Sequence, residues 1–142
     1  MAVSRFLTNS TTLVLNGELI KDFINGDVIE LAFVNPLTSR VYGANRAVNI
    51  TQRSDADVAT LTVRVQRYSD NDVFFSEVIN SENIVVLEGS LKEVYIKDGS
   101  ESVESYEILS GSITTQPSYT KNNQEATATV EYVIEAFIRR LV

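Results

Sequence analysis

The segment from Val48 to Ile79, VNITQRSDADVATLTVRVQRYSDNDVFFSEVI, contains the most specific local pattern in the chain. Apolar and polar residues alternate from Val58 to Arg67. One side carries Ala59, Leu61, Val63 and Val65, and the other carries Thr60, Thr62, Arg64 and Gln66. Because successive side chains of a strand point to opposite faces, this alternation predicts a strand with one buried and one wet face.

A short helix is predicted directly after this strand, from Asp70 to Ile79. Ser69 is a favourable N-cap residue, and Asp72 lies three positions later, where an acidic side chain can reach back to the cap. Acidic residues also suit the positive end of a helix. Apolar residues four apart within Phe74–Ile79 form stripes that need a packing partner.

Length and composition indicate one folded domain spanning residues 1–142. The chain is 44% hydrophobic and 22% charged, which is ordinary for a globular protein. Most of the remaining segments resemble short strands separated by turns, and one helix is predicted. The fold class is therefore mostly β, with one short helix packed on the outside.

Three dipeptides predict tight turns between strands: Asn16-Gly17, Asn25-Gly26 and Asp98-Gly99. Glu88-Gly89-Ser90 is predicted to separate two further strands, Asn83–Leu87 and Leu91–Lys97. A glycine inside a strand pattern, Gly111, predicts a bulge or twist.

The longest predicted strand runs from Ala126 to Arg139. Its apolar side carries Ala126, Ala128, Val130, Tyr132, Ile134, Ala136 and Ile138. At about 3.3 Å per residue this strand would span roughly 45 Å, whereas a typical strand has about 5 to 6 residues. Such a length suits a strand that extends past its own subunit or follows a barrel wall.

Between Asn35 and Ala47 the sequence NPLTSRVYGANRA is polar and has little periodicity. It predicts a long loop or the tip of an extended hairpin. Loops of this length are often functional, so assembly contacts are one interpretation. A mobile surface loop without a role is the other.

Charge and composition exclude several classes of function. The chain has 12 basic and 19 acidic residues, a net charge of -7 and a pI of about 4.6, which disfavours binding to phosphate backbones. It has no cysteine and no histidine, so it lacks thiolate chemistry and the commonest general base and metal ligand. We therefore expect no enzyme, no catalytic residue, no cofactor and no metal site.

Carboxylate pairs occur at Asp55 with Asp57 and at Asp70 with Asp72, but neither has the spacing of a calcium loop. A turn and a helix start explain them better. The first residues, MAVSRFLTNS, contain no apolar run typical of a signal peptide, and no segment has the apolar length of a membrane span. A cytoplasm-like location without a membrane anchor is expected.

Taken together, the chain resembles the tail tube proteins of contractile-tailed (myovirus-type) bacteriophages. The resemblance covers nearly the whole sequence and consists of residue type and spacing. Its positions are Leu15-Asn16-Gly17, Gly26-Asp27, Gly43-Ala44, Arg53-Ser54, Thr60–Val65, Ser69 with Asn71-Asp72, Ile113–Tyr119 and Ala126–Phe137.

This resemblance implies a β-sandwich or β-barrel subunit of tail-tube type that forms hexameric rings. The rings would stack into a hollow tube inside a contractile sheath, and DNA would leave through the lumen without specific binding. The implied partners are further copies of the chain, the tail sheath protein, and baseplate and tail terminator proteins. The implied location is the virion tail, assembled in the host cytoplasm.

Two sets of residues are predicted to act in such an assembly. Polar side chains of the two long strands would line the lumen, namely Thr60, Thr62, Gln66, Thr127, Thr129, Glu131 and Glu135. Residues in or beside the long loop would contact a neighbouring subunit or ring, namely Arg40, Tyr42, Arg46 and Arg53.

Related roles remain open at this level. A tail terminator, a baseplate-proximal tube protein, or the tube of a phage-like secretion or bacteriocin particle would have a similar sequence. A β-rich carbohydrate- or peptide-binding module is a more distant alternative. Such modules usually display exposed aromatic residues, and tryptophan is absent from this chain.

Overall fold

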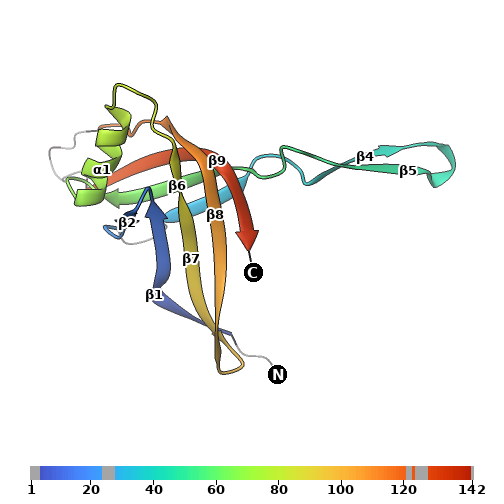
Figure 1. The fold of residues 1–142 in the computed structure, drawn as a ribbon, viewed down its shortest axis with the longest axis horizontal. Helices are drawn as coiled ribbons and strands as arrows, with labels where there is room; N and C mark the ends of the chain where they lie inside the picture. Colours follow the sequence, from blue (N-terminus) through green and yellow to red (C-terminus); the bar gives the residue numbers. More distant parts are fainter. Residues whose placement is uncertain (1–3, 24–27, 121–122, 124–127, 142) are drawn as a thin grey trace.

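A computed structural model describes residues 4–23, 28–120, 123 and 128–141. The mostly β fold is as predicted, with seven strands in one sheet, a separate two-stranded hairpin, and one α-helix in the described part of the chain (Figure 1). In sheet order the seven strands are β2 (Glu18–Ile20), β1 (Ser4–Leu15), β7 (Leu87–Lys97), β8 (Ser100–Thr115), β9 (Thr129–Leu141), β6 (Val58–Gln66) and β3 (Ile29–Phe33).

The sheet is bent around the hydrophobic core, and its described strands do not close into a barrel, because β2 and β3 are at the two ends of the strand order. In Figure 1, β1, β7 and β8 run down the page while β3, β6 and β9 run across it. Beyond β2 the chain crosses toward β6, where the backbone N–H of Gln66 donates to the carbonyl of Asp22 at 2.8 Å. Phe23 forms an isolated bridge to Val65. This crossing brings the two edges together at one end of the sheet.

The two-faced strands β6 and β9 pair with each other and supply much of the core. Alternation predicted their buried faces correctly, and each core residue below has 8% or less of its surface exposed. The core consists of Leu13, Leu15, Ile20, Ala59, Leu61, Val63, Val65, Phe75, Leu87, Leu91, Ile108, Val130, Tyr132, Ile134, Ala136 and Ile138.

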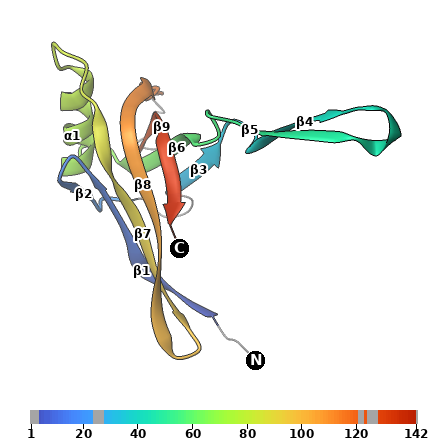
Figure 2. The same ribbon diagram turned by 45° about the vertical axis from the view of Figure 1, so that its right-hand side comes forward.

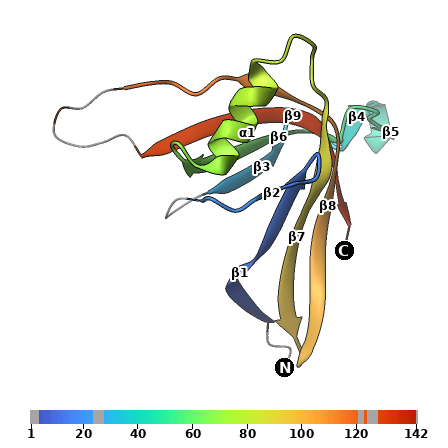
Figure 3. The ribbon, with the colours of Figure 1, turned by 60° about the vertical axis from the view of Figure 1, so that its left-hand side comes forward.

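The predicted helix forms as α1 (Asp70–Ile79) and lies across β6 and β9 (Figure 3). Ser69 caps it, because its Oγ accepts from the backbone N–H of Asp72 at 3.3 Å. The Asp72 carboxylate accepts from the N–H of Tyr68, one residue before the cap, at 2.8 Å. Phe75 is fully buried and stacks on Tyr132, with ring centroids 4.6 Å apart. Stacked aromatic pairs add stability beyond the area they bury.

Two predicted turns are confirmed. Asn16 and Gly17 have φ values of 49° and 81° between β1 and β2, and Asp98 and Gly99 have 52° and 79° between β7 and β8. These positive angles are what a two-residue hairpin turn requires. The third predicted turn, Asn25-Gly26, lies outside the described residues.

The prediction of two strands flanking Glu88-Gly89-Ser90 is wrong. β7 begins at Leu87 and continues through Gly89, whereas 83–86 are not in a strand. A Cβ at position 89 would lie 1.8 Å from the carbonyl oxygen of Val14 on β1. Glycine therefore serves a close approach between strands here and does not form a turn.

The predicted longest strand exists, but it is not the longest. β9 begins at Thr129 and has 13 residues, whereas β8 has 16. The pairing of β8 with β9 shifts between Leu109 and Ser112, around Gly111, as predicted from the glycine. A bulge of this kind lets β8 bend while it continues to pair with β9.

The segment predicted as a long loop or extended hairpin is a hairpin. β4 (Thr38–Tyr42) and β5 (Val48–Gln52) are antiparallel and are joined by the short 3-10 helix η1 (Ala44–Arg46). We call residues 38–52 the arm. Figures 1 and 2 show it protruding from the body of the molecule, and every residue in it is exposed.

Candidate assembly surfaces

The arm has one apolar face. Cross-strand pairing places Tyr42 opposite Val48 and Arg40 opposite Ile50, so these four side chains share a face. The other face is mainly polar and carries Ser39, Val41, Asn49 and Thr51. Tyr42 is 68% exposed and Ile50 is 63% exposed. An isolated two-stranded hairpin is marginally stable in water, so this face has the character of a contact surface without its partner.

The arm is also basic. No acidic residue occurs between Leu31 and Ser54, although the chain as a whole has a net charge of -7. The guanidinium of Arg40 lies 5.3 Å from the centre of the Tyr42 ring, a cation–π contact on the apolar face. Arg46 lies at the tip, in η1.

Arg53 differs from the other predicted contact residues because it is paired within its own chain. Its Nε and NH2 atoms each donate to the Asp55 carboxylate at 2.9 Å. The Arg53 hydrogen bond is the main cause of the lowered pKa of Asp55. Arg53 therefore anchors the root of the arm, while Arg40, Tyr42 and Arg46 are carried outward.

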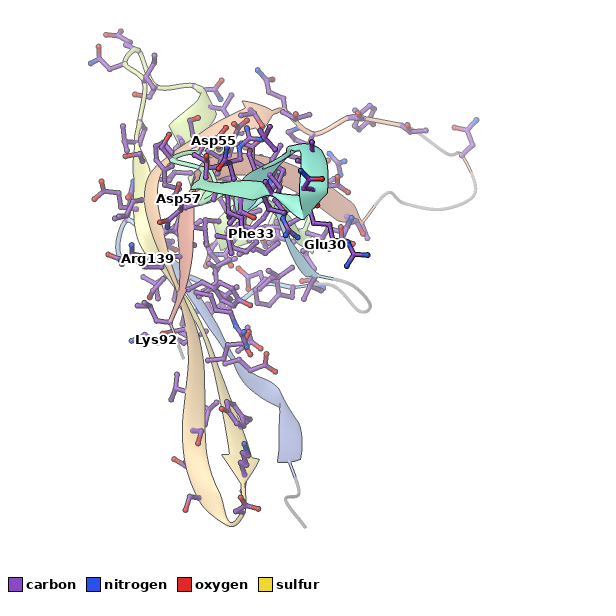
Figure 4. The ribbon with its side chains drawn as sticks, turned by 90° about the vertical axis from the view of Figure 1, so that its right-hand side faces the viewer. Glu30, Phe33, Asp55, Asp57, Lys92 and Arg139 are labelled. Atoms are coloured by element: carbon purple, nitrogen blue, oxygen red, sulfur yellow. The ribbon has the colours of Figure 1, made fainter. Side chains whose placement is uncertain are left out.

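At this root a groove of about 590 Å³ separates the arm from the end of β9. Its lining includes Phe33, Leu37, Arg53, Arg139 and Arg140. Figure 4, viewed along the arm, labels Phe33 and Arg139 here, together with Asp55 and Asp57 of the turn between β5 and β6. Asp57 also lines this groove, so the root of the arm carries charges of both signs.

The predicted lumen-lining residues lie on the face of β6 and β9 that points away from the core. Cross-strand register places Thr60 opposite Glu135 and Gln66 opposite Thr129. Thr62 and Glu131 share this face, and none of the six is buried. Thr127 lies outside the described residues. The position of the six described residues is compatible with a lumen. Their assignment to the lumen stays a prediction, because a single subunit does not show which face points inward in a tube.

An ion-pair group joins three strands on the same face. Arg64 on β6 donates to Glu131 on β9 at 3.0 Å and to Glu30 on β3 at 3.1 Å. The hydrogen bond to Glu30 is the largest contribution raising the pKa of Arg64. Because two carboxylates share one guanidinium, the group formed by Arg64, Glu30 and Glu131 has a net negative charge.

The open side of the sheet leaves a wide groove of about 900 Å³ between β3 and the β1–β7–β8 half. It is lined by apolar Leu19, Ile29, Leu31 and Leu91 and by Glu93 and Glu104. Glu93 and Glu104 are directly opposite each other on β7 and β8. The Glu104 carboxylate accepts a hydrogen bond from the Tyr106 hydroxyl at 2.6 Å and forms an ion pair with Arg140 at 3.4 Å. The hydrogen bond from Tyr106 is the main cause of the lowered pKa of Glu104.

A smaller groove of about 310 Å³ lies at the C-terminal end of α1. Its apolar lining includes Ile79, Ile84, Val85 and Ile113, and Glu82 is the one acidic residue in the lining. Ile84 is 89% exposed, the largest exposed fraction among the large hydrophobic residues described. We call this the α1 groove.

Buried polar groups beneath α1 are satisfied and have a structural role. Asn71 is fully buried; its side-chain oxygen accepts from the backbone N–H groups of Lys21 and Asp22, and its Nδ2 donates to the Leu19 carbonyl. The Tyr132 hydroxyl donates to the Asp72 carboxylate. Burial, and then this bond to Asp72, raises the pKa of Tyr132 to about 12.

Within the described residues, no group of three or more acidic, histidine or cysteine side chains is placed to hold a metal ion. None of the helices in that part of the chain is long and apolar enough to cross a membrane.

Comparison with solved structures relates this architecture to a known one. The chain is similar to Hcp1 from Flavobacterium johnsoniae, with a TM-score of 0.50 and 17% sequence identity, over 92% of this chain and 93% of that chain. The fold is tail-tube-like. No protein-family model matches the chain, and no curated protein matches it by sequence. At this identity the likeness shows the fold alone.

The sequence did not predict the α1 groove or the Arg64 group. Arg64 was assigned to the wet face, but its two partners come from β3 and β9, 34 residues before it and 67 after it. Only the register of three strands brings them together. Ile84 was predicted to be in a strand, so its exposure next to α1 had no signal in the periodicity.

Proposed function

We propose that this protein is the subunit of a hollow tube, in which rings of identical copies stack inside a contractile particle. The observation that carries the proposal is the arm. It projects from the body, exposes an apolar face and adds nothing to the core of its own chain. Such a structure is stable and useful when it packs on another copy.

The sheet supports ring formation. Among the described strands β3 pairs with β6 alone, so in that part of the chain its other edge presents unpaired backbone groups. Exposed edges invite pairing with other chains, and closing a ring of subunits would cover them. The wet face of β6 and β9 would then form part of an inner wall.

Within the proposal, the particle is a phage tail with six copies in each ring. The tube would contact the sheath, the baseplate and the terminator, and DNA would pass through it without specific binding. Negative charge in the lumen, from Glu30, Glu131 and Glu135, would repel the phosphate backbone. The protein would then be located in the virion tail after assembly in the host cytoplasm.

A tube of a phage-like secretion or bacteriocin particle is the second candidate. The likeness to Hcp1 supports a tail-tube-like fold and is equally compatible with that role. The arm, the edges and the wet face have the same function in both cases.

Negative-stain microscopy of the purified protein, with sedimentation velocity, tests the proposal. We expect rings or tubes of uniform width. Reversing Arg40 and Arg46 to glutamate should leave a folded monomer that no longer assembles. The control variant changes Lys92 and Lys97 to glutamate, which alters the net charge by the same amount. Both are exposed residues of β7 away from the arm, so assembly should remain intact (Figure 4 labels Lys92).

Arg53 was also predicted to contact a neighbouring copy, but it is a poor residue for this charge-reversal experiment. Reversing it would place a glutamate next to Asp55 and break the pair at the root of the arm. Failure of that variant to assemble would therefore not separate a lost contact from a displaced arm. Monomers at every concentration in the wild type would reject the proposal, and single rings that never stack would favour a terminator.

A further inference from the structure

The apolar face of the arm and the α1 groove have complementary chemistry. The arm offers Tyr42, Val48 and Ile50 with the guanidinium of Arg40 among them. The groove offers Ile79, Ile84 and Val85 with Glu82 at its edge. Burying exposed apolar side chains drives association, and opposite charges at the edge of the contact set its register.

Electrostatics at the end of α1 favour a cation from outside the helix. Helix C-termini carry partial negative charge and are stabilised by basic residues in the last turn. The last turn of α1 has no basic residue and instead contains Glu77. No lysine or arginine occurs between Arg67 and Lys92, a stretch that also includes Glu82 and Glu88.

Other surfaces fit the arm less well. The wide groove on the open side of the sheet contains Lys21 beside Glu93 and Glu104, and Glu104 is already paired with Arg140. The groove at the arm root is lined by Arg53, Arg139 and Arg140 with Asp57 as its one acidic residue, so it offers a basic arm no net negative charge. Neither Glu77 nor Glu82 forms an ion pair within the described residues.

We infer that the arm of one copy docks in the α1 groove of the next copy, with Arg40 and Arg46 facing Glu82 and Glu77. The arm and α1 lie at opposite ends of the longest axis of the molecule (Figure 1). The contact is therefore head-to-tail, the kind that produces closed rings or continuing stacks rather than a two-fold dimer. This inference rests on the proposed tube function and names the surface that receives the arm.

Photo-crosslinking from the arm tests the docking directly. Tyr42 is replaced by benzoylphenylalanine in the full chain, the assembly is irradiated, and tryptic peptides are identified. Because no lysine or arginine separates Arg67 from Lys92, trypsin releases the whole α1 end as one peptide, residues 68–92. We expect cross-links to residues 77–85 of this peptide, and mixing isotopically light and heavy protein should show that they join two copies.

The same probe at Val41, on the opposite face of β4, is the matched control and should give few cross-links to residues 68–92. Cross-links from Tyr42 to residues 6–21 or 93–97 instead would place the arm in the wide groove and overturn the inference. Tubes that form without a cross-link to the α1 end would also overturn it while leaving the proposed function intact. A wild-type protein that never assembles would reject both.

Charge exchange provides an independent test in the full-length protein. Changing Glu82 to arginine should reduce assembly strongly, and adding Arg40→Glu in the same chain should restore part of it. Glu101→Arg, an exposed change on β8, should assemble like the wild type. If the double variant assembles no better than Glu82→Arg alone, the pairing of Arg40 with Glu82 is wrong.

Discussion

At the scale of single residues, Tyr132 links the helix to the sheet. Its ring stacks on Phe75, its hydroxyl donates to Asp72, and only 1% of its surface is exposed. Asp72 was predicted as a helix-start residue, which is correct, but its second role as the acceptor for Tyr132 was not visible in the sequence. The two residues are 60 positions apart, and only the packing of α1 on β9 brings them together.

We predict that the Tyr132 hydroxyl makes stability sensitive to alkaline pH. Its pKa is raised from 10.0 to about 12, so the folded protein keeps a proton that the unfolded chain loses. The stabilisation is therefore fully present below about pH 10 and is lost as the pH rises toward about 12. Tyr132→Phe should destabilise by about 1–2 kcal/mol at neutral pH, because the Asp72 carboxylate loses a buried donor.

Urea unfolding of both proteins over a pH series measures this effect. The stability difference between wild type and Tyr132→Phe should shrink as the pH rises through this alkaline range. Tyr68→Phe, at a residue that is 84% exposed, is the control and should follow the wild type. A difference between wild type and Tyr132→Phe that stays constant at all pH values contradicts the assignment.

At the scale of elements, strands and helices were predicted most accurately where a single local pattern, such as alternation or an N-cap, determines the structure. Alternation identified β6 and β9, and the Ser69 cap identified the start of α1. Glycine was harder to interpret, because it marks a turn at Gly17 and Gly99 and a close approach at Gly89. The difference depends on which strand lies opposite, and that information is not local. The arm was predicted as one of two possibilities, since a hairpin without a core has little periodicity.

We predict that Gly89→Ala severely destabilises the protein. The added Cβ would meet the carbonyl oxygen of Val14 at 1.8 Å, a backbone atom that cannot move without separating β1 from β7. Overpacking of this kind costs about 3 kcal/mol or more. Gly43→Ala is the control, because its Cβ would meet Ala47 Cβ at 3.4 Å and the Ala47 carbonyl oxygen at 3.8 Å, which are ordinary contacts. It should change stability by less than about 0.5 kcal/mol. Denaturant unfolding compares the two, and equal stabilities would show that β1 and β7 do not approach closely here.

At the scale of the whole molecule, three features act together: a two-faced sheet, the basic arm at one end, and the α1 groove at the other. Length and alternation indicated the mostly β fold, and the resemblance to tail tube proteins agrees with the tail-tube-like architecture. The long loop predicted the residues that the arm carries outward, Arg40, Tyr42 and Arg46. The α1 groove that would receive them was not predicted, because it consists of exposed residues that periodicity does not distinguish from ordinary surface.

We predict that charge on the wet face controls the passage of DNA. Glu135→Lys would add one positive charge per subunit to the proposed lumen without disturbing the core, since Glu135 is exposed. Tubes should still form and should now retain short duplex DNA at low salt, with release as salt rises toward about 200 mM. Co-sedimentation of DNA with tubes measures this, and Glu101→Lys is the control. Retention by the control alone would contradict the lumen assignment.

In the proposed assembly, copies of this chain form a tube with the wet face of β6 and β9 on the inside. Cryo-electron microscopy of the assembled wild-type protein tests it most directly. We expect stacked rings around a hollow lumen, with Thr60, Thr62 and Glu135 facing the channel. A map in which these side chains lie on the outer surface or within a subunit core, or a protein that stays monomeric at every concentration, would contradict it.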